Sequence, residues 1–163
     1  MRNLREQTLN MNDRQRLWLG SGLVLLQFGL LAVLALLAWP AVEQLKIPLA
    51  AWLTGGAGVA LALWAFTANR PGNFNIHPRP RVGGTLVTSG PYGWIRHPMY
   101  TAFLLGAWAL AWTAGSDEAW LAWWALSLVL WTKSQLEERW LLQQHPGYAH
   151  YREQTKRFIP WLY

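Results

Sequence analysis

Two basic segments between long apolar runs contain side chains that could bind an anion. One is NIHPRPR, which contains His77, and the other is RHPMY, in which Arg96 and His97 directly precede Pro98. Two cations at the N-terminus of a helix oppose the helix dipole unless they face a negative group. An anionic ligand group would remove this conflict. Contact with lipid headgroups alone is the alternative that the residues leave open.

An acidic pair follows the last apolar run of the chain. Lys133 and Glu137 are spaced i and i+4 and share a helix face, whereas Glu137 and Glu138 point about 100° apart. We therefore expect at most one of the two glutamates to face a given pocket. A carboxylate one turn beyond an apolar helix is a functional candidate because acids near lipid are expensive. The alternative is an exposed Lys-Glu pair, which stabilises a helix by only ~0.3 kcal/mol.

The residue types exclude several other kinds of site. The chain contains no cysteine, so it has no disulfide, thiolate metal site or cysteine nucleophile. Its four histidines show no metal-ligand spacing, and we expect no bound metal. No Ser-His-Asp signature is present, and no Gly-rich nucleotide loop follows a strand. We expect no nucleic-acid partner either, because basic residues and stacking aromatics do not interleave on one face.

The composition predicts that the chain lies in a bilayer. Hydrophobic residues make up 53% of the chain and charged residues only 13%, against about 25% charged in a typical soluble domain. Thirteen tryptophans strengthen this prediction, because amphipathic rings concentrate where hydrocarbon meets lipid headgroups. We therefore expect an integral membrane protein.

Four apolar runs predict an all-α membrane domain that occupies residues 1–163 as a single unit. Two runs have 23 uncharged residues each, enough to cross a hydrocarbon core of about 30 Å. The third has 18 and the fourth only 14, so we expect the fourth helix to continue to about residue 144 through the good helix formers of KSQLEERWLLQQ. The expected spans are 17–39, 47–69, 99–116 and 119–132, with a loop at 70–98 and a C-terminal segment at 145–163.

Two local features of these spans carry further expectations. Asp117 and Glu118 are expected to form the turn between the third and fourth spans. Three small residues in the second span, Gly55, Gly56 and Gly58, are expected to permit close packing against a neighbouring helix.

The placement of lysine and arginine predicts the orientation of the spans. Counted along the chain before, between and after the spans, the basic residues number four, one, four, none and five. Basic residues concentrate on the cytoplasmic side, so both termini and the 70–98 loop are expected in the cytoplasm. We expect the membrane to be a bacterial cytoplasmic one, with an endoplasmic reticulum as the alternative.

Several motifs in the second half of the chain together resemble a known family. They are GGTLVTSGPYGWIRHPMY, EERWLL and GYAHYREQTKRFIP, in the family's order and at nearly its spacing. On these motifs, over residues 75–160, the chain resembles the isoprenylcysteine carboxyl methyltransferases, which are related to the phospholipid N-methyltransferases. The resemblance implies a membrane methyltransferase that uses S-adenosylmethionine, with the cofactor in a cytoplasmic pocket formed by the loop and closed by the C-terminal segment.

The resemblance also implies roles for individual residues, without distinguishing which glutamate binds the cofactor. The predicted catalytic residues are Arg96, His97, Glu137 and Glu138. The predicted cofactor-binding residues are His77, Gly84, Thr85, Leu86, Val87, Tyr92, His97, Pro98, Met99, Tyr100, Glu137 and Glu138. The predicted substrate-binding residues are Lys133 and Arg157. Lys133 departs from the arginine of some members, because lysine offers a point charge in place of a planar fork.

The chemistry of S-adenosylmethionine matches these residue types. Its ammonium could bind one of the glutamates, and its carboxylate could bind Arg96 or His97. Tyr92, Trp94 or Tyr100 could stack on the adenine or the sulfonium. Methyl transfer is an in-line displacement, so the pocket has mainly to align and desolvate the reactants. A neutral thiol or amine acceptor must also lose a proton, to His97 or to water.

The methyl acceptor is expected to be a lipophilic or small molecule with a carboxylate, thiol or amine, entering laterally from membrane lipid. Six tryptophans could line that path, with packing or lipid contact as the alternative for each. They are Trp108, Trp112, Trp120, Trp123, Trp124 and Trp131. Two other functions stay open: a sterol-reductase-like enzyme with a nicotinamide cofactor, and a non-catalytic membrane scaffold of the same fold.

Overall fold

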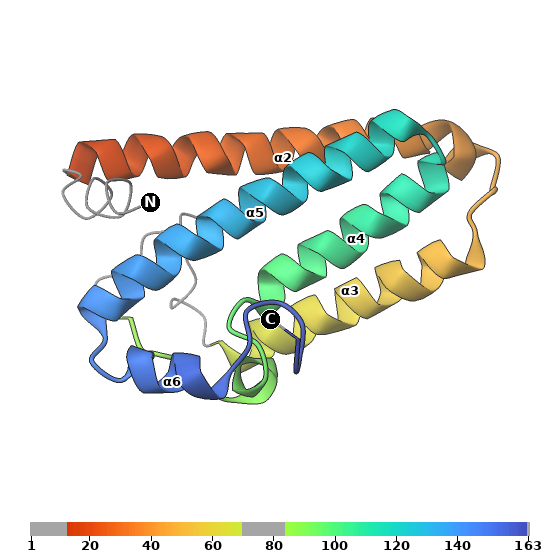
Figure 1. The fold of residues 1–163 in the computed structure, drawn as a ribbon. Helices are drawn as coiled ribbons and strands as arrows, with labels where there is room; N and C mark the ends of the chain where they lie inside the picture. The colour runs from red at the N-terminus through yellow and green to blue at the C-terminus, as the bar shows by residue number, and fades with distance from the viewer. Residues whose placement is uncertain (1–12, 70–83, 163) are drawn as a thin grey trace.

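The computed structural model describes residues 13–69 and 84–162, and within these ranges it is all-helical (Figure 1). The long helices run roughly alongside one another. The α2–α3 and α4–α5 connections lie at one end of the bundle, and α6 and the C-terminus lie at the other. The helices are α2 (Asp13–Glu43), α3 (Leu49–Ala68), the short 3-10 helix η1 (Gly90–Gly93), α4 (Pro98–Ala114), α5 (Asp117–Gln144) and α6 (Tyr148–Gln154).

Each of the four predicted spans coincides with one long helix. Two segments, Leu17–Glu43 in α2 and Leu49–Ala68 in α3, are long and apolar enough to cross a membrane. Only 22% and 17% of their most apolar windows are buried inside the protein. The exposed apolar faces of these helices therefore fit a lipid environment, as expected for a membrane protein.

The α4–α5 connection corrects one expectation. Gly115 ends α4 in a left-handed conformation with φ of 62°, and the Ser116 hydroxyl caps α5 by accepting from the Ala119 amide at 3.3 Å. Asp117 and Glu118 lie in the first turn of α5, where acids interact favourably with the helix dipole. The expectation that they form the turn was wrong. The continuation of α5 to Gln144 is confirmed.

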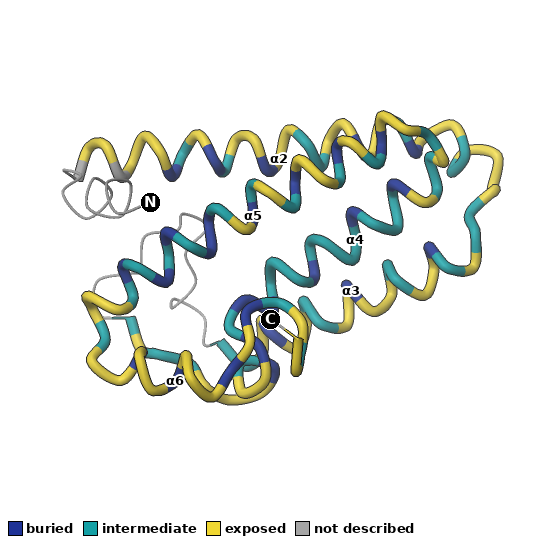
Figure 2. Tube along the Cα trace, in the orientation of Figure 1, coloured by how far each residue is buried: buried dark blue, intermediate teal, exposed yellow. Residues whose placement is uncertain are grey.

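The helices pack in a defined order around a small core. Helix α3 lies along α4, while α2 contacts both α4 and α5. Buried positions follow the facing sides of α4 and α5, and α2 and α3 remain largely exposed (Figure 2). The main core cluster consists of Leu34, Ala107, Ala111, Ala119, Ala122, Leu126 and Leu130. Alanine at four of these positions lets the helices approach closely.

Gly58 is the glycine that brings α3 close to α4. A Cβ atom built on Gly58 lies 3.0 Å from the Ala102 carbonyl oxygen and 3.2 Å from the Gly106 amide nitrogen. Gly55 has ordinary contact at 3.4 Å from the Ala109 Cβ, and Gly56 has nothing within 4 Å. The expected close packing is therefore confirmed at Gly58 and not at Gly56.

Replacing Gly58 with alanine is expected to lower the free energy of unfolding by about 1–3 kcal/mol, because the added methyl meets backbone that cannot move independently. Gly56→Ala is the matched control. It adds the same methyl to the same helix without a clash, and we expect unchanged or slightly higher stability. Unfolding by SDS titration in mixed micelles measures both variants. Equal stability of the two would contradict the assigned contact.

Five of the six tryptophans pack against one another near the α4–α5 connection. The centroids of contacting rings lie 4.8–6.2 Å apart. One indole, that of Trp123, donates to the Leu104 carbonyl oxygen at 3.1 Å. Trp131 is outside this cluster and 42% exposed. The structure thus shows packing for Trp108, Trp120 and Trp123, whereas Trp112 and Trp124 make ring contacts and are also 43% and 64% exposed.

Candidate functional site

The segment after α6 docks beside the start of α4 and forms the site. Ile95 and Lys156 make an isolated parallel bridge. The Arg96 amide donates to the Lys156 carbonyl at 2.8 Å, and the His97 amide donates to the Arg157 carbonyl at 3.1 Å. Pro98 occupies the first turn of α4, where its missing amide proton costs nothing. Backbone pairing therefore brings Arg96, His97 and Arg157 together, although 60 positions separate Arg157 from His97.

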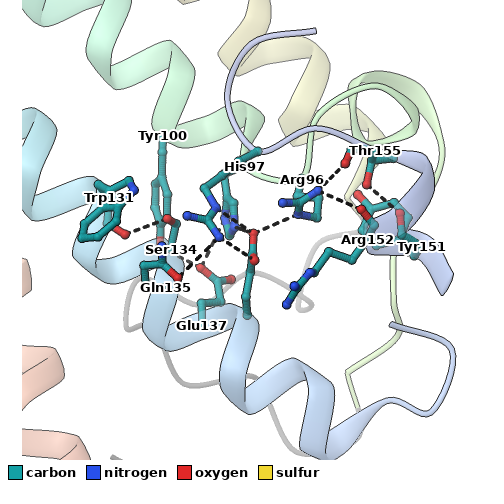
Figure 3. Close-up of polar contacts among 12 residues, drawn as sticks. Arg96, His97, Tyr100, Trp131, Ser134, Gln135, Glu137, Tyr151, Arg152 and Thr155 are labelled. Atoms are coloured by element: carbon teal, nitrogen blue, oxygen red, sulfur yellow. Dashed lines mark hydrogen bonds and ion pairs between the residues drawn. The ribbon is translucent and has the colours of Figure 1, made fainter. Parts of the chain in front are cut away.

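Glu138 of α5 is the centre of this cluster. Figure 3 shows its neighbours Arg96, His97 and Glu137 with the polar contacts between them as dashed lines. Its Oε1 accepts from Arg96 Nε at 2.8 Å and from Arg157 Nε at 3.1 Å, and it lies 3.2 Å from His97 Nε2. Its Oε2 accepts from Arg157 Nη2 at 2.9 Å. The Glu138 side chain is 3% exposed and those of both arginines 9%. One carboxylate is thus surrounded by three nitrogen-bearing side chains.

These contacts hold Glu138 in its charged form. Burial alone raises the pKa of a carboxyl group, because the charged form is poorly solvated. Hydrogen bonds from His97, Arg157 and Arg96 act in the opposite direction and outweigh burial, so the pKa of Glu138 is lowered far below its usual range. Glu138 is therefore negatively charged at neutral pH, opposite the two arginines.

Glu137 has a different environment. Its Oε2 accepts from the Tyr100 hydroxyl at 2.9 Å and lies 3.7 Å from His97 Nδ1. Its side chain is 29% exposed, and among the described residues no hydrogen bond is made by its Oε1. The two carboxylates lie at different nitrogens of the His97 ring, Glu137 at Nδ1 and Glu138 at Nε2.

The His97 and Tyr100 rings lie beside this pair of carboxylates. The rings of His97 and Tyr100 stack with centroids 5.2 Å apart and planes 1° apart. Lys133 Nζ lies 5.3 Å above the Tyr100 ring. The same ammonium donates to Gln27 Oε1 of α2 at 2.6 Å, and Lys133 is 1% exposed. An exposed Lys-Glu pair, the alternative stated for this residue, is thus not what the structure shows.

Other predicted residues lie further from this cluster or outside the described ranges. His77 lies outside the described residues. Gly84, Thr85, Leu86 and Val87 lie in a segment without regular secondary structure before η1, and Pro98 and Met99 lie in the first turn of α4. Trp94 is 58% exposed and packs edge-on against Trp64 at 5.5 Å.

Tyr92 lies in η1 beside the cluster. Its carbonyl accepts from the Tyr151 hydroxyl at 2.7 Å, which ties η1 to α6. Burial, and then the charge of Glu137, raises the pKa of the Tyr92 hydroxyl to about 12. The Tyr92 hydroxyl therefore stays protonated at neutral pH.

Several residues of the site were not predicted. The Arg96 guanidinium donates to the carbonyls of Arg152 and Thr155, which fixes its position. Phe158 packs on the His97 ring at 5.9 Å. Gln27 was also missed, although a polar side chain inside a run of 23 uncharged residues was a signal that could have found it.

The arrangement defines a class of protein: a helical membrane protein with a buried ion cluster, a partly exposed carboxylate and stacked aromatic rings at one end of its bundle. Such a site can bind a small ligand that carries both a cation and an aromatic ring. Within residues 13–69 and 84–162, no group of three or more histidine, cysteine, aspartate or glutamate side chains is placed to hold a metal ion.

Comparison with known proteins identifies the family. The model of the family described as phospholipid methyltransferase matches residues 49–146, and the chain belongs to this family. It is also 37% identical over 83 residues to the cobalt-zinc-cadmium resistance protein CzcN of Cupriavidus metallidurans. That match covers 50% of this chain and 38% of CzcN. No solved structure matches the chain. The resemblance found in the sequence motifs is thus confirmed at the level of the family.

Proposed function

We propose that this protein is an S-adenosylmethionine-dependent methyltransferase that methylates a lipophilic acceptor at the membrane. Membership of the phospholipid methyltransferase family supports the reaction class. The observation that carries the cofactor assignment is the paired environment of Glu137 and Glu138, in which one carboxylate is fully paired and the other keeps an open oxygen beside aromatic rings.

Glu137 is the better candidate for the cofactor ammonium. Glu138 already accepts hydrogen bonds from both arginines and is 3% exposed, so a further cation would have to displace one of them. Glu137 is 29% exposed and accepts one hydrogen bond, from Tyr100. A charge-assisted hydrogen bond to a partly desolvated carboxylate is also among the stronger polar contacts. We therefore assign cofactor binding to Glu137 and positioning to Glu138.

The bound cofactor supplies an activated methyl group, and the protein residues provide alignment and exclusion of water. Glu138 holds Arg96 and Arg157, and through them the C-terminal segment, against the start of α4. Both nitrogens of the His97 ring face carboxylates, which fixes the orientation of the ring. A carboxylate or thiolate acceptor needs no further base, and we propose that a neutral amine or thiol loses its proton to water.

The proposed setting is a bacterial cytoplasmic membrane crossed by all four long helices, with the termini and the site on the cytoplasmic side. Five basic residues follow the fourth span and none lies between the third and fourth spans, which supports this orientation. The acceptor would approach from lipid towards Lys133, whose ammonium is buried between α2 and α5. Arg157 is engaged with Glu138, so its effect on the acceptor would be indirect.

Two other functions are weaker on these observations. A sterol-reductase-like enzyme would need a nicotinamide site, and the family match supports methyl transfer instead. A non-catalytic scaffold would have no reason to keep a partly exposed carboxylate beside stacked rings. The name of CzcN concerns metal resistance and names no reaction. We propose methyl transfer as the reaction to test first, because the family match supports it.

Calorimetric titration of the detergent-purified protein tests the proposal. We expect S-adenosylmethionine and S-adenosylhomocysteine to bind with micromolar Kd and NADPH not to bind. Transfer of a labelled methyl group to a panel of lipophilic carboxylates, thiols and amines would then identify the acceptor. A folded sample that binds NADPH would support the reductase. A folded sample that binds none of the three ligands would support the scaffold.

A further inference from the structure

Tyr148, in the first turn of α6, carries a buried hydroxyl that no described residue pairs. Its side chain is 1% exposed, and its hydroxyl makes no hydrogen bond within the described parts of the chain. Tyr151, three positions later, provides a contrast, because its hydroxyl donates to the Tyr92 carbonyl at 2.7 Å. The two rings pack against each other with centroids 5.8 Å apart.

A buried hydroxyl without a partner is unusual in proteins. Most buried polar side-chain atoms have at least one hydrogen-bond partner, and an exception calls for a ligand, an ion or a water at that point. The unpaired Tyr148 hydroxyl therefore indicates that a bound group supplies its missing hydrogen-bond partner. A phenylalanine would fill the same volume without leaving this hydroxyl unsatisfied, so packing alone does not account for the tyrosine.

The surrounding charges indicate the kind of group. Burial first, and then the carboxylates of Glu138 and Glu137, raise the pKa of the Tyr148 hydroxyl, and Arg96 acts in the opposite direction. The hydroxyl therefore stays protonated at neutral pH and can both donate and accept a hydrogen bond. The Arg96 guanidinium donates both to the Glu138 carboxylate at 2.8 Å and to the Arg152 carbonyl of α6 at 3.2 Å. A cation and an anion therefore lie together beside α6, which suits a zwitterion.

We infer that Tyr148 is a further cofactor-binding residue, whose hydroxyl hydrogen-bonds the zwitterionic amino-acid group of S-adenosylmethionine beside Glu137. The ammonium of that group can donate to the phenolic oxygen, and its carboxylate can accept the phenolic proton. One ligand group thus satisfies both capacities of the buried hydroxyl. This inference rests on the proposed function and adds a residue of α6 to the cofactor site.

Tyr148→Phe tests the inference when two ligands are compared. S-adenosylhomocysteine contains the amino-acid group, and 5′-methylthioadenosine has the same nucleoside and sulfur without it. We expect Tyr148→Phe to raise the Kd of S-adenosylhomocysteine about tenfold, the typical effect of one hydrogen bond to a charged group. The Kd of 5′-methylthioadenosine should change less than twofold, and the unfolding midpoint should not fall.

Tyr151→Phe is the matched control, because it removes a hydroxyl that is already paired within the protein. We expect a lower unfolding midpoint and an unchanged ratio of the two Kd values. Equal loss of both ligands in Tyr148→Phe, or unchanged binding of S-adenosylhomocysteine, would overturn the inference while leaving the proposed function standing. Absence of S-adenosylhomocysteine binding in the wild-type protein would overturn both.

Discussion

Glu138→Gln is expected to lower the free energy of unfolding by about 3–5 kcal/mol, the usual cost of removing one partner from a buried ion pair. Glutamine keeps the shape of the side chain and loses its charge, so the guanidinium groups of Arg96 and Arg157 are left without the anion that neutralises them. The C-terminal segment should detach from α4 as a result. SDS titration in mixed micelles measures the loss.

Glu153→Gln is the matched control, because its side chain is 79% exposed on α6 and the same substitution there should leave stability unchanged.

The dependence of stability on acid pH provides a second check. The pKa of Glu138 is lowered in the folded protein, so its contribution is complete above the unfolded value of about 4.5 and is lost as the pH falls through the folded pKa. The stability difference between wild type and Glu138→Gln should therefore narrow in acid. A difference that is small at pH 7 would contradict the central role of Glu138.

The long helices could be located from the sequence, because a long uncharged apolar run can be recognised from the local residues alone. Uncharged runs of 23 residues fixed α2 and α3 to within a few positions. The predicted α4–α5 turn lies about two residues too late, because Asp117 and Glu118 favour the first turn of a helix over the loop before it. Ser116 before two acids was the signal for the correct start of α5.

The site was harder to predict, because residue spacing shows only which side chains share a face of the same helix. It does not show which side chains of different helices make contact. The spacing placed Lys133 and Glu137 on one face, yet the ammonium of Lys133 donates to Gln27, 106 positions away. Likewise, the 100° between Glu137 and Glu138 could not show that one histidine ring would lie between them. The family motifs suggested that these residues meet, and only the packing of the C-terminal segment shows how.

Glu137→Gln is expected to raise the Kd of S-adenosylmethionine about 10–100-fold while the protein stays folded. The glutamine oxygen can still accept from the Tyr100 hydroxyl, so the hydrogen bond of 2.9 Å is retained and only the charge is lost. The proposed partner of that charge is the cofactor ammonium. Calorimetry gives the Kd, and steady-state kinetics should show a larger effect on KM for the cofactor than on kcat.

Tyr100→Phe is the matched control, because it removes the same hydrogen bond and leaves the carboxylate charged. If Glu137 acts through its charge, Tyr100→Phe should weaken cofactor binding much less than Glu137→Gln. If both variants weaken cofactor binding equally, the Tyr100–Glu137 hydrogen bond and not the charge of Glu137 would be responsible for the effect. Unchanged cofactor binding in a folded Glu137→Gln protein would contradict the assignment and return the ammonium site to Glu138, whose arginines would then have to move aside on binding.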